Sequence, residues 1–419
     1  MIERLVFDNG LCLLTESMPA VRSVSLGAWL TRGSRHEDPV HSGIAHFVEH
    51  MLFKGTTSRT AEGIAQEIDS IGGHLDAFTA KECASYYVKV LDEHLPRAVD
   101  VLSDLLLNPA FAGEDIRREQ NVVVEEIKMV EDTPDDLVYE IFTARFWQNH
   151  QLGQPILGTA ESVRAFDADA LRTYFSDAYT AQNFVIAAAG NIDHAAIGEL
   201  VGDAFSALPV SSQSIPVSAP EVDIQLEIRE KDLEQAHLCL GTAGYEHTHP
   251  DRYASYILNA VLGGSMSSRL FQKIREKRGL AYAVSSSLTS YHDVGNLTVY
   301  AGCDGGAVRQ VIDLVVDEMQ TLKSHPLPTV ELQRAKDHLR GSFVLGLEST
   351  TSRMSQLARS EMCFGRQIDV TETLHAIELV TQEDVQRVAC DLFQEGALAG
   401  AVVGPITKAD VGASQLNLS

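Results

Sequence analysis

The sequence predicts a protein of two similar halves in which strands and helices alternate, a pattern typical of α/β and α+β folds. Three observations favour this class: a length of 419 residues that suits two to four domains, an aperiodic segment near the middle, and a layout that repeats on either side of it. The middle segment, LPVSSQSIPVSAPEV at residues 208–222, is poor in charge and rich in Ser and Pro, which indicates an extended linker. We therefore expect a first domain at 1–208, a linker at 209–222 and a second domain at 223–419.

The elements of the first half follow from their hydrophobic periods. Residues 1–16, MIERLVFDNGLCLLTE, lack a basic region followed by a long apolar core, so they predict a strand and a turn and not a secretion signal. Short apolar runs rich in β-branched and aromatic residues predict further strands, and longer runs with apolar residues three and four apart predict helices. The expected strands are 21–30, 85–92 and 183–192, and the expected helices are 43–53, 60–72, 95–107 and 114–132.

The second half repeats this layout. In both halves a strand that ends near glycine leads to a helix, a turn of small residues, a second helix closed by glycine, and further strands. Aligning the helix near 252 with the one near 43 pairs His46 with Ser255, Glu49 with Leu258 and His50 with Asn259. The second copy therefore lacks the polar residues of the first, which suggests chemistry in the first half and a supporting role for the second.

Composition and charge exclude several classes of partner. The 58 acidic and 33 basic residues give a formal charge of −25, which argues against binding to nucleic acid or to anionic membranes. The negative charge either attracts a basic partner or substrate or only confers solubility. No segment approaches the roughly 18–20 apolar residues of a membrane span. The six cysteines are scattered without a C-x-x-C pair, which favours reduced thiols and a cytoplasmic location.

The stretch HFVEH at residues 46–50 carries the first candidate site. On a helix His46 and His50 lie one turn apart on one face, with Glu49 beside them. This spacing allows two imidazoles to bind one Zn²⁺, and Glu49 is placed to accept a proton from a water that attacks a carbonyl. H-x-x-E-H is the inverted form of the H-E-x-x-H zinc motif. The alternative is an amphipathic helix with two partly buried histidines and no metal.

A zinc site needs a third protein ligand, and residues 114–132, EDIRREQNVVVEEIKMVED, offer the best candidates. A buried carboxylate is costly unless it is paired or bound to metal, which singles out the glutamates on the apolar face of this predicted helix. We expect Glu126 to be the third ligand and Glu119 to orient a ligand, with pairing to a core arginine as the alternative. The predicted apolar face consists of Glu119, Val122, Val123, Glu126 and Val130.

Two segments of the second half also carry candidate residues. GGSMSSRLFQKIREKRGLAYAV, at 263–284, predicts a small-residue turn, a basic helix and a glycine break into a strand. Its excess of Arg and Lys is notable in an acidic chain, although a solvated basic face followed by a core tyrosine explains it as well. His247 and His249, in EHTHP, are expected to lie in a solvated loop and not in a metal site.

His46-x-x-Glu49-His50, followed 76 positions later by Glu126, with Glu119 seven residues before that, resembles the pitrilysin/insulysin family of inverted zinc metallopeptidases. The chain is most similar to the branch of short chains that includes the mitochondrial processing peptidases and their bacterial relatives. The resemblance implies zinc at His46, His50 and Glu126, with Glu49 as the general base and Glu119 as a supporting carboxylate. It covers nearly the full length, including GGHLDAFTAKE (72–82), YYVKVLDEHL (86–95) and REKRGLAYAV (275–284).

The resemblance also implies residues that hold the substrate. Arg275 and Tyr282 would lie opposite the zinc, where they would hold the substrate backbone and donate to the developing oxyanion. One strand would bind an extended peptide by strand addition, reading backbone more than side chains. Asp76 stands in this strand where the family usually has Asn, so the role of the position is open. The residues of the strand are Leu75, Asp76, Ala77, Phe78 and Thr79.

We therefore expect an α+β zinc metalloendopeptidase whose two halves, each of helices packed on largely antiparallel sheets, form a clam-like chamber. The resemblance implies one zinc per chain, extended or unfolded peptide substrates, including basic ones, and a homodimer, with a related inactive chain as the alternative partner. A non-catalytic subunit or scaffold of the same fold is the main rival, and such a chain would be expected to lack at least one of the five site residues. A metal-binding protein without hydrolysis leaves Glu49 unexplained.

Overall fold

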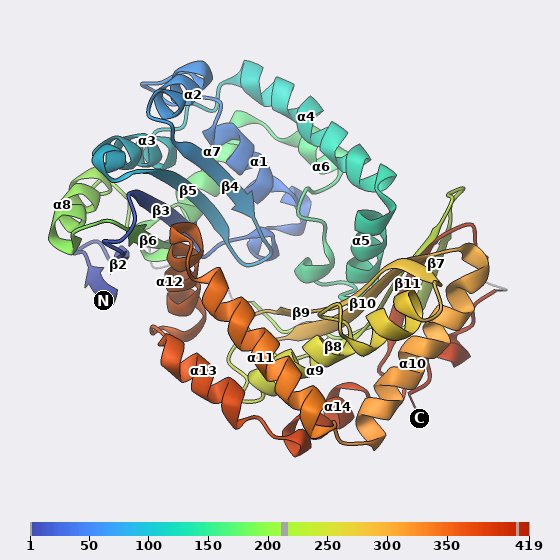
Figure 1. Ribbon diagram of the computed structural model, residues 1–419. Helices are drawn as coiled ribbons and strands as arrows, with labels where there is room; N and C mark the ends of the chain where they lie inside the picture. The colour runs from blue at the N-terminus through green and yellow to red at the C-terminus, as the bar shows by residue number, and fades with distance from the viewer. Residues whose placement is uncertain (1, 211–216, 408–409, 419) are drawn as a thin grey trace. The chain divides into compact units, whose positions relative to one another are not determined.

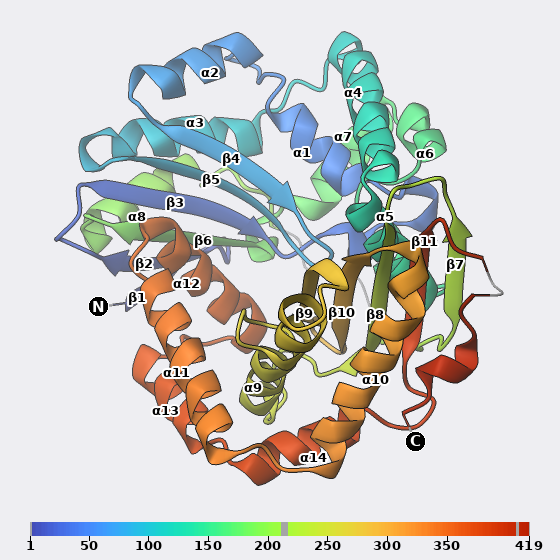
Figure 2. The ribbon, with the colours of Figure 1, turned by 45° about the vertical axis from the view of Figure 1, so that its right-hand side comes forward.

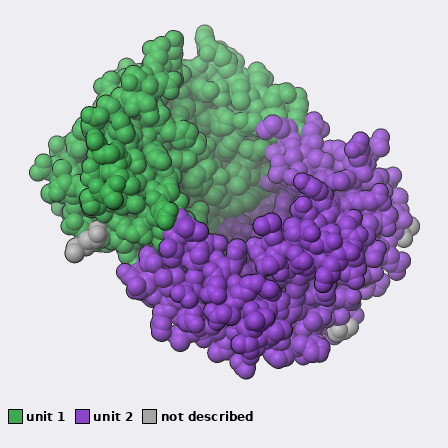
Figure 3. All heavy atoms as spheres, in the orientation of Figure 1, with its two compact units in different colours: residues 1–128, 154–217, 346–367 green, residues 129–153, 218–345, 368–419 purple. Residues whose placement is uncertain are grey.

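The computed structural model describes residues 2–210, 217–407 and 410–418, and the chain forms two compact units. Figure 3 colours the two units separately. Unit 1 consists of residues 1–128, 154–217 and 346–367, and unit 2 consists of residues 129–153, 218–345 and 368–419.

The expected linker contains one passage of the chain between the units, at residues 217 and 218. Residues 211–216 of this linker lie outside the described residues, and its remaining residues form neither helix nor strand. The units also exchange two segments that the sequence analysis assigned to the opposite domain. Residues 129–153 belong to unit 2, and residues 346–367 belong to unit 1.

Within the described residues, unit 1 is built on a six-stranded sheet in the order β1-β2-β6-β3-β5-β4 (Figure 2). Its neighbouring strands are antiparallel except for β2 and β6, which are parallel. β4 is therefore an edge strand, paired with β5 on one side. The strands are β1 (Ile2–Val6), β2 (Cys12–Ser17), β3 (Ser23–Leu30), β4 (His74–Thr79), β5 (Ala84–Leu91) and β6 (Phe184–Gly190).

Alternate residues of the unit 1 strands enter two separate cores, because successive side chains of a strand point to opposite faces. In β6, Ile186 and Ala188 face the larger core, whereas Val185 and Ala187 face the smaller one. The sheet is therefore a middle layer covered on both faces. The helices that line the larger core are α1 (Ile44–Leu52), α2 (Ala61–Ser70), α3 (Leu95–Leu107), α4 (Gly113–Asp132), α6 (Ala160–Ala165), α7 (Ala168–Ala178) and α8 (His194–Ala204).

The smaller core of unit 1 is closed by α12 (Thr350–Phe364), a helix from the second half of the sequence (Figure 1). Met354 of α12 is fully buried in this core beside Trp29. A Cβ atom at Gly27 of β3 would come within 2.5 Å of Met354 Sδ, so the helix packs closely on the strand at this glycine. The hydrophobic period of this helix does not indicate that it packs on the sheet of unit 1.

Replacing Met354 by alanine is expected to lower the free energy of unfolding of unit 1 by about 2–5 kcal/mol, because it leaves a cavity between α12 and the sheet. The two tryptophans of the chain report on different units, since Trp29 lies in unit 1 and Trp147 in unit 2. Urea unfolding would be followed by fluorescence in a Trp147→Phe background. Met266→Ala is the matched control, because that side chain is 77% exposed and its loss is expected to change little. Equal midpoints for the two variants would contradict the packing of α12.

Within the described residues, unit 2 is built on a five-stranded sheet in the order β7-β11-β8-β10-β9, in which β7 and β11 are parallel and the other neighbours antiparallel. Counted along the chain, these are the first, last, second, fourth and third strands of the unit. Strands β2, β6, β3, β5 and β4 of unit 1 follow the same scheme, which supports a duplication. The strands are β7 (Leu226–Glu230), β8 (Ala236–Gly244), β9 (Ala281–Ser290), β10 (Gly295–Cys303) and β11 (Ala399–Gly404).

The sheet of unit 2 is also covered on both faces. One face packs against α5 (Pro134–Phe146), which comes from the first half of the sequence and contributes Phe142 and Phe146. The expected basic helix is present as a π-helical turn, Phe271–Glu276, ahead of β9. The helices of the opposite face are α9 (Arg252–Leu262), α10 (Val308–Ser324), α11 (Thr329–Gly346), α13 (Val370–Leu379) and α14 (Gln382–Leu392).

The structure confirms the predicted α+β class, with two similar parts that each pack helices on a largely antiparallel sheet. All six cysteines lie in the described part of the chain and are free. Among the helices of the described residues, none combines the length and apolar character needed to cross a membrane.

Candidate active site

The stretch HFVEH lies in α1, which buries one apolar face in unit 1. His46, Glu49 and His50 remain partly accessible on the opposite flank of the helix. The apolar residues recur three and four positions apart, which is the reason why this segment is a helix and why the polar trio shares one side. The buried residues of α1 are Ile44, Ala45, Phe47, Val48, Met51 and Leu52.

The start of α1 is fixed by a buried carboxylate. Oε2 and Oε1 of Glu37 accept hydrogen bonds from the backbone N–H groups of Gly43 and Ala45, both at 2.8 Å. Negative charge at this end of a helix is favourable, because its first N–H groups have no partner within the helix. Gly43 has a φ of 92°, and a Cβ atom there would lie 2.6 Å from the carbonyl oxygen of Leu157. The chain therefore needs glycine at the point where α1 begins.

Replacing Glu37 by glutamine is expected to remove a pH dependence of stability. Burial raises the pKa of Glu37 from 4.5 to about 7, although the N–H groups of Ala45 and Gly43 act in the opposite direction. The folded state therefore favours the protonated form, so this stabilisation is present below pH 4.5 and is lost as the pH rises through about 7. A shift of this size corresponds to roughly 3 kcal/mol.

The measurement for Glu37→Gln is the unfolding midpoint of unit 1 between pH 4.5 and 8, compared with wild type in the same Trp147→Phe background. Wild type is expected to lose more stability than the variant over this range. Glu199→Gln, a change at an exposed residue of α8, is expected to follow wild type. Parallel profiles for wild type and Glu37→Gln would show that Glu37 does not titrate in this range.

His46 and His50 of α1 and Glu126 of α4 form a cluster whose ligand atoms all lie within 4.8 Å of one another. Oε2 of Glu126 lies 3.5 Å from Nε2 of His50 and 4.0 Å from Nε2 of His46. Two atoms bound to one tetrahedral Zn²⁺ lie roughly 3.4 Å apart, so the three side chains need little adjustment to share a metal. Two imidazoles and one carboxylate are also a known ligand set of catalytic zinc sites. The residues present therefore fit zinc.

His46 presents a neutral nitrogen atom to this cluster, and His50 directs its Nε2 atom toward it. Burial, and then the neighbouring His50, lower the pKa of His46 to about 4, so at neutral pH its ring is uncharged and can donate a lone pair. Nδ1 of His50 bonds to Oε2 of Glu119 at 3.1 Å, which leaves Nε2 of His50 free to face Glu126. Among the described residues, buried Nδ1 of His46 has no hydrogen-bond partner.

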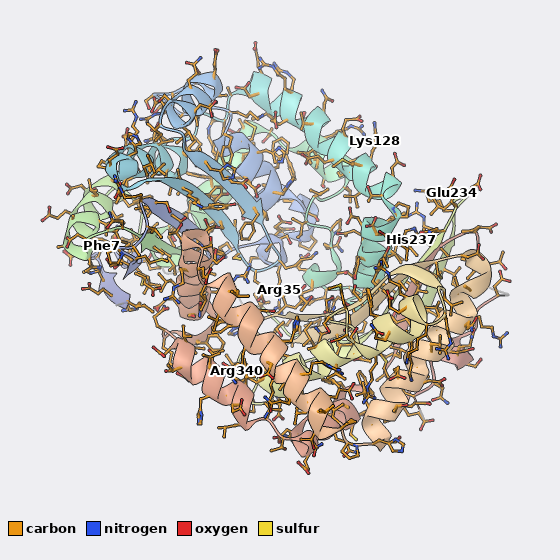
Figure 4. All side chains as sticks on the ribbon, in the orientation of Figure 1. Phe7, Arg35, Lys128, Glu234, His237 and Arg340 are labelled. Atoms are coloured by element: carbon orange, nitrogen blue, oxygen red, sulfur yellow. The ribbon has the colours of Figure 1, made fainter. Side chains whose placement is uncertain are left out.

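Glu119 lies on the inner side of α4 and is 4% exposed. Its second oxygen, Oε1, pairs with Nζ of Lys54 at 2.8 Å. The partners of the buried Glu119 are thus a lysine and a histidine. The core arginine that was the alternative expected from the sequence is not among them. The apolar face of α4 is narrower than predicted, because Val122 is 43% exposed whereas Val123 is buried. Beyond Glu126, the exposed side of α4 carries Lys128, which Figure 4 labels.

Glu49 lies beside the cluster and bonds to β4, since its Oε2 accepts a hydrogen bond from the hydroxyl of Thr79. Burial raises the pKa of Glu49, and the negative charges of Asp76 and Glu126 act in the same direction, whereas the Thr79 bond lowers it. A carboxylate whose pKa is raised holds a proton more readily near neutral pH, which suits a general base that must later return the proton. Thr79 belongs to the strand that is predicted to bind the substrate, and its hydrogen bond joins that strand to Glu49.

The backbone of β4 presents hydrogen-bonding groups at an open edge. The N–H of Ala80 bonds to the carbonyl of Cys83 at 2.7 Å where β4 turns into β5. Because paired residues of antiparallel strands alternate between bonded and non-bonded, Leu75, Ala77 and Thr79 direct their N–H and C=O groups away from β5.

The loop before α1 holds the turn between β4 and β5. The N–H of Ser34 bonds to the carbonyl of Ala80 at 3.1 Å, and the N–H of Arg35 bonds to that of Lys81 at 2.7 Å. The buried guanidinium of Arg35, labelled in Figure 4, pairs with Glu82 at 2.5 Å. The open edge of β4 is therefore anchored at the end where Thr79 contacts Glu49.

Arg275 and Tyr282 lie together in unit 2. The guanidinium carbon of Arg275 lies 4.8 Å from the ring centre of Tyr282 and 4.8 Å from that of Phe271, so the cation rests between two aromatic rings. Tyr282 is 77% exposed, which disagrees with the alternative of a core tyrosine. Their expected position opposite the zinc cluster stays a prediction.

Lys54 and Glu37 support the site but were not predicted from the sequence. Lys54 follows His50 by four positions, so its place on the same side of the chain offered a signal that was not used. Glu37 offered none, because it lies in a loop and its two bonds are to backbone. His249 lies outside helices and strands and stacks on Tyr245 with ring centres 3.7 Å apart, so it is not part of a metal cluster in the described residues.

An H-x-x-E-H helix with a nearby glutamate, set in a duplicated α+β fold, is characteristic of the inverted zinc metallopeptidases. The chain belongs to peptidase family M16: residues 12–160 match the description "Insulinase (Peptidase family M16)", and residues 165–339 match "Peptidase M16 inactive domain". The second description fits the absence of histidine and glutamate at Ser255, Leu258 and Asn259 of α9. The resemblance stated from the sequence is thereby confirmed.

Relatives and solved structures agree with this family. The chain is 43% identical over 405 residues to the uncharacterized zinc protease YmxG of Bacillus subtilis. This alignment covers 97% of the present chain and 98% of YmxG. The chain is 40% identical over 413 residues to an uncharacterized zinc protease of Streptomyces coelicolor, covering 97% and 90%. Crystal structures of a peptidase M16 inactive domain from Pseudomonas fluorescens (TM-score 0.90, 21% identity, 97% and 98% covered) and a protease from Helicobacter pylori (TM-score 0.89, 20% identity, 97% and 99% covered) share the fold.

Proposed function

We propose that the chain is a zinc-dependent metalloendopeptidase that hydrolyses peptide bonds in extended or unfolded peptides. The observation that carries this proposal is the convergence of His46, His50 and Glu126, with Glu49 beside them and not needed as a ligand. Zinc bound by the three ligands would supply a Lewis acid that polarises a carbonyl and activates water. The relatives named zinc proteases support the same chemistry.

Glu49 performs the proton transfers of this mechanism. Its carboxylate accepts a proton from the attacking water and passes it to the nitrogen of the leaving amine when the peptide bond breaks. Thr79 holds one carboxylate oxygen in place, so that the other can face the reacting water. Glu119 holds the ring of His50 in the orientation that presents Nε2, and Lys54 pairs with the other oxygen of Glu119.

The open edge of β4 binds the substrate as an added strand. The outward N–H and C=O groups of Leu75, Ala77 and Thr79 match the hydrogen-bonding pattern of an extended peptide. Because these contacts read the peptide backbone, the enzyme accepts many unfolded sequences. Thr79 connects this strand to Glu49, so a peptide paired with β4 passes close to the general base.

Arg275 and Tyr282 complete the proposed site from unit 2. In this proposal they hold the substrate backbone and donate hydrogen bonds to the oxyanion that develops on the attacked carbonyl. The stacking of Arg275 between two aromatic rings favours a fixed orientation for its donors. It follows that residues 1–208 alone would lack both these donors and α12. The clam-like chamber, the homodimer and the cytoplasmic location remain predictions from the resemblance.

A non-catalytic subunit of the same fold is the competing proposal. The inactive-domain match covers residues 165–339, which contain none of the motif residues, whereas unit 1 holds all three ligands and Glu49 together. A scaffold would not need an aligned general base. The structure therefore favours the catalytic proposal.

Chelation tests the proposed function. Incubating the full chain with a strong zinc chelator is expected to abolish cleavage of an unfolded peptide substrate, and added Zn²⁺ is expected to restore it. Metal content, measured by atomic spectroscopy, is expected to fall from about one zinc per chain to near zero in parallel. Cleavage that persists in chain shown to be free of metal would refute the zinc mechanism.

A further inference from the structure

We propose that a small pocket in unit 2 binds a phosphate group, supplied either by inorganic phosphate or by a small phosphomonoester. The pocket lies between α9, the turn that follows this helix, and α11, so all of its wall belongs to one unit. It takes no part in the proposed peptidase mechanism, and the inference does not depend on that mechanism. Part of the wall is apolar, and its polar residues are Ser265, Ser267, Glu331, Arg334 and His338.

Arg334 and His338 supply hydrogen-bond donors on the α11 side of the pocket. They lie four positions apart, which is about one turn, so they share one side of the helix. Within the described residues, neither side chain forms a hydrogen bond or an ion pair. Arg340, which Figure 4 labels on the same helix, does pair, since its Nη1 lies 3.4 Å from Oε2 of Glu378. The donors of Arg334 are therefore available to a ligand.

The acid in the wall of the pocket is already compensated. Both oxygens of Glu331 accept hydrogen bonds from Arg269, at 3.0 and 2.7 Å. Arg269 also lies 3.6 Å from the buried Glu318, which pairs with Lys273 as well. These two cations and two acids balance each other, so Arg334 is left as a positive charge without a counter-ion among the described residues. An anion is the ligand that such a charge favours, because it can accept charge-assisted hydrogen bonds.

The turn after α9 supplies hydroxyl groups from a second side. The Oγ atoms of Ser265 and Ser267 lie 3.3 Å apart, and the other contact of Ser265, with the carbonyl of Ala260, is long at 3.5 Å. A serine hydroxyl rotates to suit its acceptor, whereas the guanidinium of Arg334 presents a planar fork for two oxygens. Donors from two sides suit a tetrahedral phosphate, whose oxygens point in several directions, better than a planar carboxylate.

The volume of the pocket limits the size of the ligand. Its empty volume, counted out to the open mouth, is about 240 Å³. A water molecule takes roughly 30 Å³ of the liquid, so the pocket has room for a phosphate group together with a few waters. Pockets that enclose drug-sized ligands measure roughly 300–1,000 Å³. A nucleotide would therefore extend beyond the pocket, which favours inorganic phosphate or a small phosphomonoester.

The experiment is a calorimetric titration of the full chain at a constant ionic strength of about 0.15 M, where long-range effects of exposed charges are largely screened. The probes are inorganic phosphate, methyl phosphate and acetate. Wild type is compared with Arg334→Gln and with a double change, Ser265→Ala and Ser267→Ala. Arg340→Gln is the matched control, because it removes the same charge from the same helix, and a residue six positions further on points to another side.

Wild type and Arg340→Gln are expected to bind phosphate with the same Kd. The Kd is expected to rise about ten-fold or more in Arg334→Gln, which loses charge-assisted hydrogen bonds, and about three- to ten-fold in the double serine variant. Acetate is expected to bind at least about ten-fold more weakly than phosphate. Tighter binding of either phosphate probe supports the proposal and identifies the source of the group. A Kd unchanged by Arg334→Gln, equal affinity for acetate, or no binding to wild type would overturn it.

A second titration separates this pocket from the proposed zinc site, because a zinc ion can also bind a phosphoryl oxygen. Phosphate is titrated into the Glu126→Gln chain, which is expected to lose zinc. An unchanged Kd for phosphate supports the pocket in unit 2. Loss of phosphate binding in this variant would overturn the proposal, because it would assign the phosphate to the metal. Neither result depends on whether the chain cleaves peptides.

Discussion

Glu49→Gln is expected to lower kcat/KM for peptide cleavage by about 10²–10⁴-fold, which is the usual contribution of a general acid–base residue. Glutamine has the same shape and can still accept the hydrogen bond from Thr79, but it cannot take a proton from water. Because Glu49 is not one of the three proposed ligands, the zinc content is expected to stay near one per chain. Activity and zinc content are measured on the same preparation.

Glu125→Gln is the matched control for this experiment. Glu125 lies on the exposed side of α4, next in sequence to Glu126, and pairs with Lys128 at 2.6 Å. The control is expected to keep both activity and zinc. If Glu49→Gln cleaved peptides as fast as the control, Glu49 would not be the general base; if it lost zinc, its role would be to hold the metal.

The second large effect is expected for Glu126→Gln. This change replaces a charged ligand by a neutral amide, and we expect the zinc affinity to fall by more than 100-fold, since substitutions that only support a ligand already cost 10–100-fold. Competition with a chromophoric chelator measures the affinity without relying on activity. Cleavage is expected to fall with zinc occupancy.

The same control, Glu125→Gln, separates the ligand role of Glu126 from a general effect of charge on α4. Both changes remove one negative charge from neighbouring positions of the helix. An equal, small change in zinc affinity for both variants would mean that Glu126 does not bind the metal.

The site could be predicted from the sequence to the extent that it depends on local periods. The spacing of His46 and His50 places them on one side of a helix, and the burial of Glu119 follows from its place among apolar residues of α4. The same periodicity places Val122 on the buried face of α4, although its side chain is 43% exposed. The width of a buried face depends on what packs against it. Glu37 could not be found, since a carboxylate that bonds to distant backbone leaves no pattern in the sequence.

The division of the chain into domains was harder to predict for a related reason. Two similar halves and an aperiodic middle segment indicate where the chain passes between units. The exchange of α5 and α12 depends instead on contacts between residues far apart in the sequence, such as Met354 with Gly27. Nothing in the period of either helix shows which sheet it covers.

The central claim is that one zinc ion is held by His46, His50 and Glu126. The most direct measurement is an anomalous difference map, recorded at the zinc absorption edge from crystals of the wild-type chain grown without a chelator. The account predicts one strong peak per chain at roughly 2.0–2.2 Å from Nε2 of both histidines and from a carboxylate oxygen of Glu126. A peak bound by other residues, or no peak in protein that cleaves peptides, would contradict it.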